Sequence, residues 1–240
     1  MNVEQTEDYA ALSDVVAKAV IETVTQKPDA LICIAGGDTP LGVFAALVHA
    51  SKQGKVDFSR AAFVGLDEWL GLGQADKGSC REMVWGHFFS HLALRDDQIC
   101  FFDGLTQSPE EECQRVDNFI TAHGGPDIIV LGIGMNGHIG FNEPGAALDT
   151  GCHVVDLDAV TQAVSVKYFG QQRHIRQGIS LGMKTILASR AIILMASGEK
   201  KADIIATTVN SAPDPAVPAT LLKPHPRLRI IVDKAAAAKL

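Results

Sequence analysis

The sequence predicts an α/β protein with an open, mostly parallel sheet and helices on both faces. Short apolar runs rich in β-branched residues recur along the whole chain, and stretches with a helical period lie between them. No Ser/Pro/Gly-rich linker, composition break or internal repeat divides the 240 residues. We therefore expect a single domain over residues 1–240.

The apolar runs are interpreted as buried strands, because a strand covered on both faces needs no polar alternation. They are Ala30–Ala35, Ala61–Leu66, Ile99–Phe102, Asp127–Gly132, Gly178–Leu181, Ala191–Ala196 and Leu228–Val232. The helical stretches are Tyr9–Val24, Leu41–Ser51, Ser79–Leu92, Pro109–His123, Val160–Tyr168 and Lys200–Thr208. Alternating strands and helices imply right-handed crossovers, a modified Rossmann-like arrangement. Ser211–Pro226 contains five prolines and is expected to follow the surface before the last strand.

Composition limits the class of protein. Hydrophobic residues make up 47% of the chain and charged residues 20%, which excludes a disordered chain. A net charge of -7 disfavours nucleic acid and anionic membranes as partners, although a local basic pocket for a small anion remains compatible with it. No apolar run approaches the roughly 20 residues of a membrane span, and the acidic N-terminus does not resemble a secretory signal. Five widely spaced cysteines without a Cys-x-x-Cys pair indicate reduced thiols in a cytoplasmic protein.

The segment Gly-Gly-Asp-Thr-Pro at 36–40 stands between a predicted strand and a predicted helix. Glycines let backbone N–H groups approach an anion, Thr39 adds a hydroxyl donor, and the helix N-terminus supplies favourable partial charge. An ordinary strand-to-helix turn, with a glycine at positive φ and a proline opening the helix, explains the same residues. The side-chain charge of Asp38 opposes a phosphate unless it points away. Both interpretations stay open from these residues alone.

Two adjacent carboxylates, Asp67 and Glu68, follow the predicted strand Ala61–Leu66. The carboxyl end of a parallel strand faces the ligand region of an open α/β sheet. A carboxylate there acts as a general base when partial burial raises its pKa, as enolisation of a sugar requires. The structural alternative is a helix or turn cap beside one solvated acid.

The loop Leu131–Gly145 follows another apolar strand and is the most informative stretch of the chain. It contains five glycines, two asparagines, one histidine and one glutamate, so its backbone must approach something closely. A neutral imidazole transfers protons near pH 7, and a neighbouring Glu143 or Asn136 fixes its tautomer. A lone histidine is more often structural, but the glycine density and the position after a strand favour a catalytic His138.

Five segments, in this order and spacing, resemble the glucosamine-6-phosphate deaminase (isomerase) family: GGDTP, VGLDEW, LGIGMNGHIGFNEPG, GISLGMKTIL and ILMASGEKKA. The resemblance runs from about residue 29 to residue 232. The string Gly-His-Ile-x-Phe-Asn-Glu-Pro is specific, because the related 6-phosphogluconolactonases share the phosphate loop and the Gly-His pair but not Phe-Asn-Glu-Pro. The motif LDEW, the Gly-x-Asn-Gly-His variant and the stretch 152–158 look closest to the galactosamine-6-phosphate branch.

The resemblance implies conversion of galactosamine 6-phosphate or glucosamine 6-phosphate to a ketohexose 6-phosphate plus ammonia, in amino sugar catabolism, without metal or organic cofactor. Asp67 matches the base that moves a proton between C2 and C1. His138 matches the residue that opens the pyranose ring, with Glu143 and Asn136 as its neighbours. The positions that match phosphate-binding residues are Gly36, Gly37, Asp38, Thr39, Lys167 and Lys201.

Three positions depart from the family pattern. Asn136 stands where most glucosamine-6-phosphate members have an aspartate, and an amide can orient His138 but cannot stabilise its cation by charge. Lys167 replaces a phosphate-binding arginine, which keeps the charge and loses the bidentate fork. Asp38 replaces a small residue of the phosphate loop.

We therefore expect an enzyme whose partner is a small sugar phosphate, with no nucleic acid or membrane partner, acting as a monomer or homo-oligomer. Two alternatives remain. One is a 6-phosphogluconolactonase-like hydrolase on a similar fold. The other is a non-catalytic sugar-phosphate-binding paralogue, a hypothesis that Asn136 keeps open.

Overall fold

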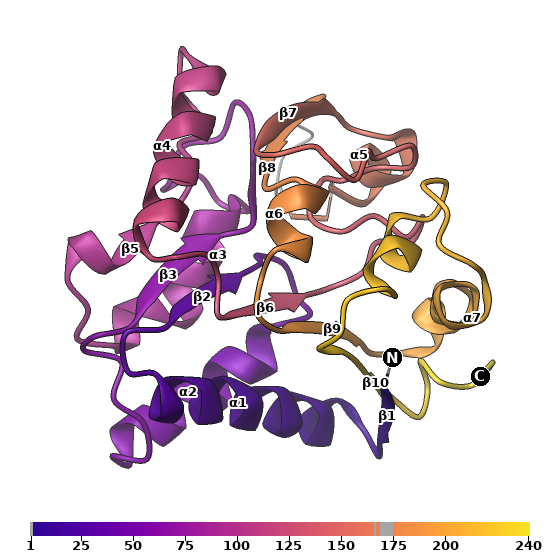
Figure 1. Ribbon diagram of the computed structural model, residues 1–240, viewed down its shortest axis with the longest axis horizontal. Coiled ribbons are helices and arrows are strands. Elements are labelled where there is room, and N and C mark those ends of the chain that lie inside the picture. The colour runs from indigo at the N-terminus through magenta and orange to yellow at the C-terminus, as the bar shows by residue number, and fades with distance from the viewer. Residues whose placement is uncertain (1, 166, 169–174) are drawn as a thin grey trace.

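The computed structural model describes residues 2–165, 167–168 and 175–240. Their strands form a seven-stranded sheet and a three-stranded sheet (Figure 1). The large sheet has the order β1-β10-β9-β6-β2-β3-β5, and all of its neighbouring strands are parallel. Its strands are β1 (Asn2–Thr6), β2 (Leu31–Ile34), β3 (Ala62–Gly65), β5 (Ile99–Cys100), β6 (Ile128–Leu131), β9 (Ile192–Ala196) and β10 (Leu228–Asp233).

Helices cover both faces of the large sheet, because each central strand alternates its side chains between two cores. In β2, Leu31 and Cys33 join one core, whereas Ile32 and Ile34 join the other. The second core lies under α1 (Tyr9–Gln26), α2 (Leu41–Lys52) and α3 (Cys80–His87), and the first lies under α4 (Pro109–Ala122), α6 (Met183–Leu187) and α7 (Ala202–Asn210). Figure 1 shows α1 and α2 below the sheet and α6 above it. The predicted fold class is confirmed.

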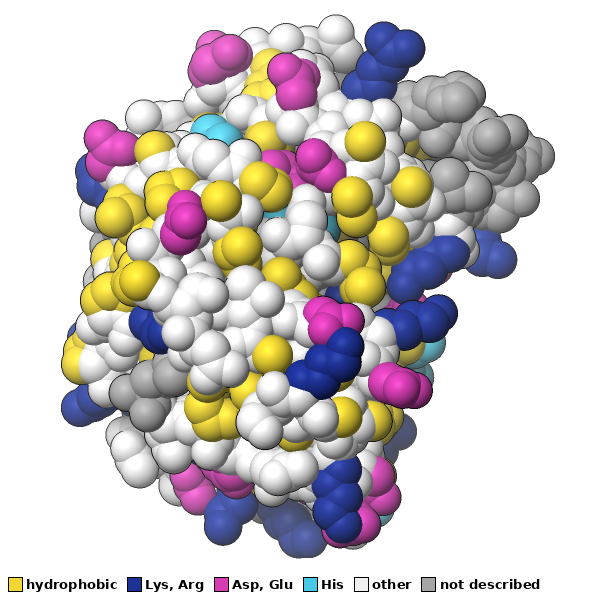
Figure 2. All heavy atoms as spheres, turned by 90° about the vertical axis from the view of Figure 1, so that its right-hand side faces the viewer, with side chains coloured by type: hydrophobic (Ala, Val, Ile, Leu, Met, Phe, Trp, Pro, Cys, Tyr) yellow, Lys and Arg dark blue, Asp and Glu magenta, His cyan; other side chains and the backbone are white. Residues whose placement is uncertain are grey.

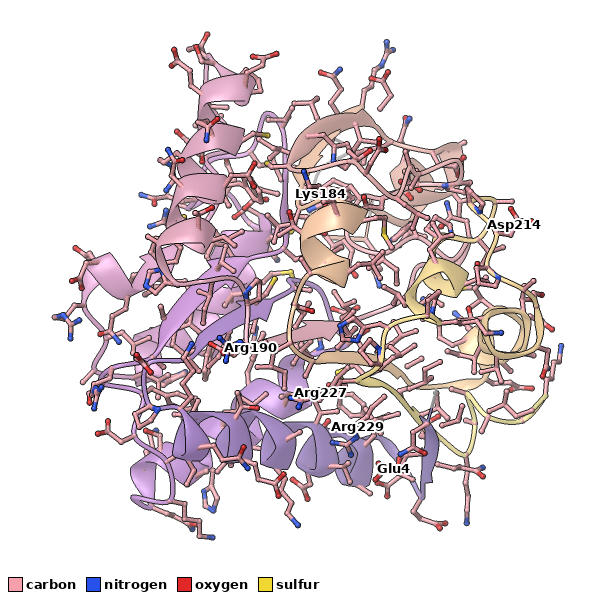
Figure 3. The ribbon with its side chains drawn as sticks, viewed as in Figure 1. Glu4, Lys184, Arg190, Asp214, Arg227 and Arg229 are labelled. Carbon is pink, nitrogen blue, oxygen red and sulfur yellow. The ribbon has the colours of Figure 1, made fainter. Side chains whose placement is uncertain are left out.

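The edge strand β1 is one element that the apolar pattern did not predict. Its sequence, Asn-Val-Glu-Gln-Thr, is polar, and it pairs with β10 on one side only. Glu4 of β1 forms an ion pair with Arg229 of β10 at 2.7 Å, and Figure 3 shows the two side chains together beside the sheet edge. A polar edge strand has no apolar run to reveal it.

The small sheet is antiparallel and has the order β4-β8-β7, with β4 (Asp67–Trp69), β8 (Gln177–Ser180) and β7 (His153–Asp156). The predicted strand Gly178–Leu181 therefore exists, but it does not belong to the parallel sheet. An apolar run predicts a buried strand without specifying its partners. Because β4 directly follows β3, this sheet continues the carboxyl end of the large one.

Three other predicted segments differ in detail. The stretch Ser211–Pro226 contains a 3-10 helix, η4 (Pro218–Leu222), whose residues are all buried, so this part belongs to the core rather than to the surface. The predicted helix Ser79–Leu92 divides at Phe88 into α3 and the short η1 (Phe89–His91). The predicted helix Val160–Tyr168 is α5 (Ala159–Ser165), and residue 166 lies outside the described residues. The remaining short helices are η2 (Asp96–Gln98) and η3 (Glu199–Lys201).

The direction of the chain reverses at β2. From β2 the chain proceeds through β3 to β5 at one edge, then returns to β6 on the other side of β2 and continues to β9 and β10. The loops that leave β2 and β6 therefore separate, and the crevice between them is the usual ligand site of an open α/β sheet. None of the helices in the described part of the chain is both long and apolar enough to cross a bilayer.

Candidate active site

A pocket of about 200 Å³ opens at this reversal point. Eight of the ten predicted site residues line it, namely Gly36, Gly37, Asp38, Thr39, Asp67, His138, Lys167 and Lys201. Asn136 and Glu143 do not line the pocket and lie behind His138. The loops after β2, β3, β6 and β9 thus bring together residues that are more than 160 positions apart in the sequence.

The loop 36–40 is held from outside by Tyr9, the first residue of α1. The Tyr9 hydroxyl donates to the Thr39 carbonyl at 2.9 Å and accepts the N–H of Gly42 at 2.8 Å. Gly37 has a φ of +94°, so the loop has the positive-φ glycine expected of a strand-to-helix turn. Gly36 has no room for a side chain, since a Cβ there would lie 2.9 Å from the Cα of Cys80. The loop is both an ordinary turn and a fixed wall of the pocket.

Two lysines approach this loop. Lys167 forms an ion pair with the Asp38 carboxylate at 2.9 Å, and both side chains are more than half exposed. Lys201 donates to the Ile133 carbonyl at 2.6 Å, and burial, together with the charge of Lys167, lowers its pKa to about 8. The negative charge of Asp38 is therefore paired within the protein rather than directed at the rest of the pocket.

The adjacent carboxylates Asp67 and Glu68 have different environments. Glu68 is 1% exposed and accepts the backbone N–H groups of Cys80 and Arg81 at 2.9 Å each, so it caps the first turn of α3. The structural alternative therefore describes Glu68. Asp67 is 8% exposed and lines the pocket. Burial raises the pKa of Asp67 to about 6, although the Cys80 thiol and the charge of His138 act in the opposite direction.

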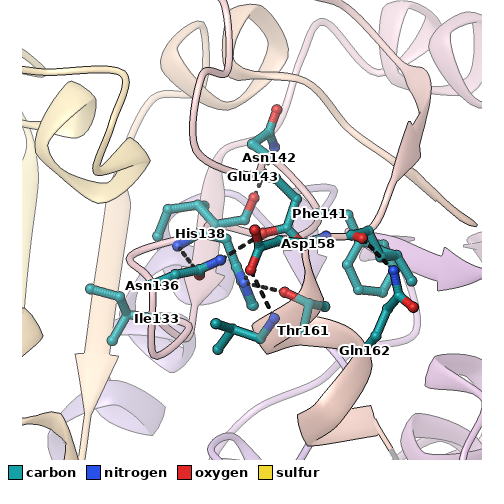
Figure 4. Close-up of polar contacts among 12 residues, drawn as sticks. Ile133, Asn136, His138, Phe141, Asn142, Glu143, Asp158, Thr161 and Gln162 are labelled. Carbon is teal, nitrogen blue, oxygen red and sulfur yellow. Dashed lines mark hydrogen bonds and ion pairs between the residues drawn. The ribbon is translucent and has the colours of Figure 1, made fainter. Parts of the chain in front are cut away.

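The imidazole of His138 lies against the loop that contains it. A Cβ at Gly134 would fall 2.4 Å from the ring, so only glycine permits this position. The Nδ1 atom lies 3.4 Å from the Glu143 carboxylate and 3.0 Å from the Thr161 hydroxyl of α5 (Figure 4). Both partners are on the Nδ1 side of the ring, so the opposite nitrogen, Nε2, is not engaged by them.

Asn136 does not contact the imidazole through the hydrogen bonds of this site. Its amide donates to Glu143 Oε2 at 2.9 Å, and its Oδ1 atom accepts the backbone N–H of His138 at 3.2 Å (Figure 4). Asn136 therefore orients Glu143 and the backbone of the loop.

Glu143 supplies negative charge beside the imidazole. Burial alone would raise its pKa, but the interactions with His138, Thr161 and Asn136 together outweigh burial and lower it. The backbone N–H of Asp158 donates to the second carboxylate oxygen at 3.3 Å. A carboxylate with this many donors remains ionised and stabilises a protonated imidazole.

Three further residues belong to the site although no sequence motif marks them: Tyr9, Cys80 and Thr161. Tyr9 and Thr161 reach the site from helices 30 and 23 residues away from their partners, and no local motif marks either. Cys80 is buried between Gly36 and Asp67, and only the fold brings it there. Within the described residues, no group of three or more His, Cys, Asp or Glu side chains is arranged to hold a metal ion.

Comparison with known proteins gives a consistent result. Residues 4–230 match the family model described as glucosamine-6-phosphate isomerases/6-phosphogluconolactonase. A glucosamine-6-phosphate deaminase of Bacillus velezensis is 38% identical over 238 residues, covering 99% of both chains. The putative deaminase AgaI of Escherichia coli K12 is 40% identical over 223 residues, covering 92% of this chain and 88% of that one.

Solved structures agree with the sequence comparison. A structure of a monomeric glucosamine-6-phosphate deaminase has a TM-score of 0.97 at 32% identity and covers 100% of both chains. A 6-phosphogluconolactonase from Thermotoga maritima has a TM-score of 0.77 at 20% identity, covering 97% of this chain and 99% of that one, a likeness of fold alone.

Proposed function

Because this chain belongs to the glucosamine-6-phosphate isomerase/6-phosphogluconolactonase family, we propose that it isomerises and deaminates a hexosamine 6-phosphate to a ketohexose 6-phosphate and ammonia. The observation that supports this reaction is that Asp67 and His138 line one pocket together with the loop 36–40 and two lysines. A general base, a second proton carrier and an anion site are the groups that the reaction needs.

Ring opening is the step assigned to His138. Its Nε2 atom takes the proton of the C1 hydroxyl, and the C1–O5 bond breaks as the same proton passes to O5, which leaves an open-chain aldehyde. The imidazole is cationic between the two transfers, and the ionised Glu143, 3.4 Å from Nδ1, stabilises that cation. Among the neighbours Asn136, Glu143 and Thr161, only Glu143 carries a charge. Most glucosamine-6-phosphate members have a second carboxylate, an aspartate, at the position of Asn136.

Proton transfer from C2 to C1 is the step assigned to Asp67. The carboxylate removes the C2 proton while the C1 oxygen takes a proton from the C2 ammonium group, which gives an enolamine. The proton held by Asp67 then passes to C1, which leaves a protonated imine at C2. Water adds to the imine and ammonia leaves, so the ketose forms. With a pKa raised to about 6 by burial, Asp67 is a stronger base than an ordinary aspartate and is still mostly ionised at neutral pH.

The phosphate is proposed to bind where the loop 36–40 meets the lysines. Gly36, Gly37 and Thr39 offer backbone and hydroxyl donors, and Lys167 and Lys201 supply positive charge as point charges. No metal or organic cofactor takes part in this scheme, since each step is a proton transfer or an addition of water.

The test is ammonia release by the purified protein, with galactosamine 6-phosphate and glucosamine 6-phosphate offered separately and the ketose phosphate measured in parallel. The branch resemblance favours galactosamine 6-phosphate, which differs from the other sugar at C4 only. Asp67→Asn should reduce kcat at least 1000-fold while retaining binding, since the base is lost and the pocket is not. Hydrolysis of 6-phosphogluconolactone without ammonia release would establish the lactonase alternative, and binding without turnover would establish the non-catalytic one.

The setting of the enzyme is also proposed. The cytoplasm fits the odd number and wide spacing of the cysteines. A monomer fits the similarity to the monomeric deaminase. On the face shown in Figure 2, hydrophobic side chains occur in small groups among polar ones. Size-exclusion chromatography with light scattering measures the oligomeric state directly.

A further inference from the structure

Thr161 is a buried hydroxyl beside the proposed ring-opening residue. It lies on α5, is 3% exposed, and places its Oγ1 atom 3.0 Å from His138 Nδ1. Its hydroxyl also interacts with the carboxylate of Glu143. The distance from Nδ1 to that carboxylate is longer, 3.4 Å. The hydroxyl is therefore the nearer of these two partners of the ring nitrogen (Figure 4).

Counting hydrogens assigns the direction of these contacts. An ionised Glu143 only accepts, so the single Thr161 O–H is satisfied by donating to it. The Thr161 oxygen then has lone pairs left, and these accept a proton from Nδ1. This arrangement requires the Nδ1–H tautomer of neutral His138, which leaves Nε2 free to accept a proton.

We propose that Thr161 is a positioning residue for His138: its hydroxyl accepts the Nδ1–H of the ring and donates to Glu143, and so keeps Nε2 unprotonated for ring opening. This inference rests on the proposed function. Thr161 does not exchange a proton with the sugar. It fixes the tautomer of His138, and it connects the imidazole to the negative charge of Glu143.

The position of Thr161 also joins two parts of the site. The segment that begins with α5 places Thr161 against His138 and, six positions later, Lys167 against Asp38 of the loop 36–40. One segment thus contacts both the proposed proton carrier and the proposed anion site. Removing the Thr161 hydroxyl is therefore expected to affect the proton carrier His138 and to leave the anion site unchanged, since only the contact with His138 involves this hydroxyl.

The first experiment compares Thr161→Val, which keeps the shape and removes the hydroxyl, with Thr161→Ser, which keeps the hydroxyl. We expect Thr161→Val to lower kcat for ammonia release about 10- to 100-fold with KM changed by less than about twofold. We expect Thr161→Ser to retain most of the rate. Thr208→Val is the matched control, because Thr208 is another buried helical threonine, whose hydroxyl donates to the Ile204 carbonyl in α7. Its kcat should equal that of the wild type.

The second experiment is independent of turnover. Nitrogen NMR of labelled His138 should show the Nδ1–H tautomer in the wild type and in Thr161→Ser, and a changed tautomer balance in Thr161→Val. An unchanged tautomer and an unchanged kcat in Thr161→Val would overturn the inference. If the wild type releases no ammonia from either sugar, the proposed function fails, while the NMR result still decides the role of Thr161.

Discussion

At the scale of single residues, the amide of Asn136 raises the question of whether an aspartate there would improve the site. Asn136 donates to Glu143 Oε2 at 2.9 Å, and that bond exists because an amide has N–H groups. An aspartate would instead place two carboxylates within hydrogen-bond distance, and one of them would have its pKa raised by the other. Asn136 therefore acts at this site as a hydrogen-bond donor to Glu143.

We predict that Asn136→Asp lowers kcat about tenfold at pH 7.5, because repulsion displaces Glu143 or leaves it protonated. The deficit relative to the wild type should shrink as the pH falls, since a protonated aspartate can donate to Glu143 as the amide does. The measurement is the ratio of the two kcat values between pH 5.5 and 8. A variant that is faster than the wild type throughout this range would show that the amide is a defect of the site.

The Asp38 carboxylate competes with an incoming anion for Lys167, because the two are paired at 2.9 Å. Asp38→Asn should therefore tighten inhibition by inorganic phosphate about threefold at low salt, and the gain should fade at high salt, since the pair is exposed and screened. Asp29→Asn, at an exposed turn away from the pocket, makes the same change in net charge and should leave phosphate affinity as it is. Equal gains in both variants would point to net charge alone.

At the scale of elements, the first residue of α1 determines the shape of the proposed phosphate loop. Tyr9→Phe removes a hydroxyl that bonds both the Thr39 carbonyl and the Gly42 N–H. We expect KM to rise about fivefold, from the loss of about 1 kcal/mol of loop ordering, with kcat changed by less than about twofold. Steady-state kinetics on the preferred sugar test this. A fall in kcat with constant KM would place Tyr9 in the chemical step instead.

The elements also show what a sequence can predict. Long amphipathic stretches such as Tyr9–Val24 and Pro109–His123 are helices in the structure. They are predictable because the apolar repeat of a helix involves residues only three or four positions apart. The edge strand Asn2–Thr6 is not predictable in this way, because it is polar and the strand with which it pairs, β10, lies more than 220 residues away. Strand Gly178–Leu181 was assigned to the wrong sheet for the same reason, since partners are not encoded locally.

The residues of the candidate site likewise fall into those that the sequence predicts and those that only the structure identifies. Residues that directly follow strands of the parallel sheet, such as Asp67 and His138, can be predicted because the carboxyl ends of these strands meet at one edge. Thr161 and Tyr9 contribute from helix positions that look ordinary in sequence, so only the packed structure identifies them. For Glu68 the sequence leaves two roles open, a catalytic carboxylate or a helix cap. Its hydrogen bonds to the α3 backbone identify it as the cap.

At the scale of the whole molecule, the buried Asp67 is expected to reduce stability. Its pKa of about 6 in the folded protein exceeds its ordinary value of 3.8, because burial disfavours the ionised form. Between these values the folded state holds a proton that the unfolded state has released, so stability falls as the pH rises. Once the pH exceeds the folded pKa, the ionised carboxylate costs about 3 kcal/mol, taking about 1.4 kcal/mol for each unit of the difference.

Replacing this carboxylate should therefore stabilise the protein while removing its proposed activity. We predict that Asp67→Asn raises the free energy of unfolding by about 3 kcal/mol at pH 8 and by about 1 kcal/mol at pH 4.5, where the wild-type carboxyl is already protonated in the fold. Denaturant unfolding at the two pH values measures both gains. Asp57→Asn is the control, because hydrogen bonds from Ser59 lower the pKa of that exposed carboxyl, and it should give no gain at pH 8. Equal gains for Asp67→Asn at both pH values would mean that packing, and not the buried charge, causes the difference in the free energy of unfolding. A larger gain at pH 8 would identify Asp67 as a base that is retained although it lowers stability.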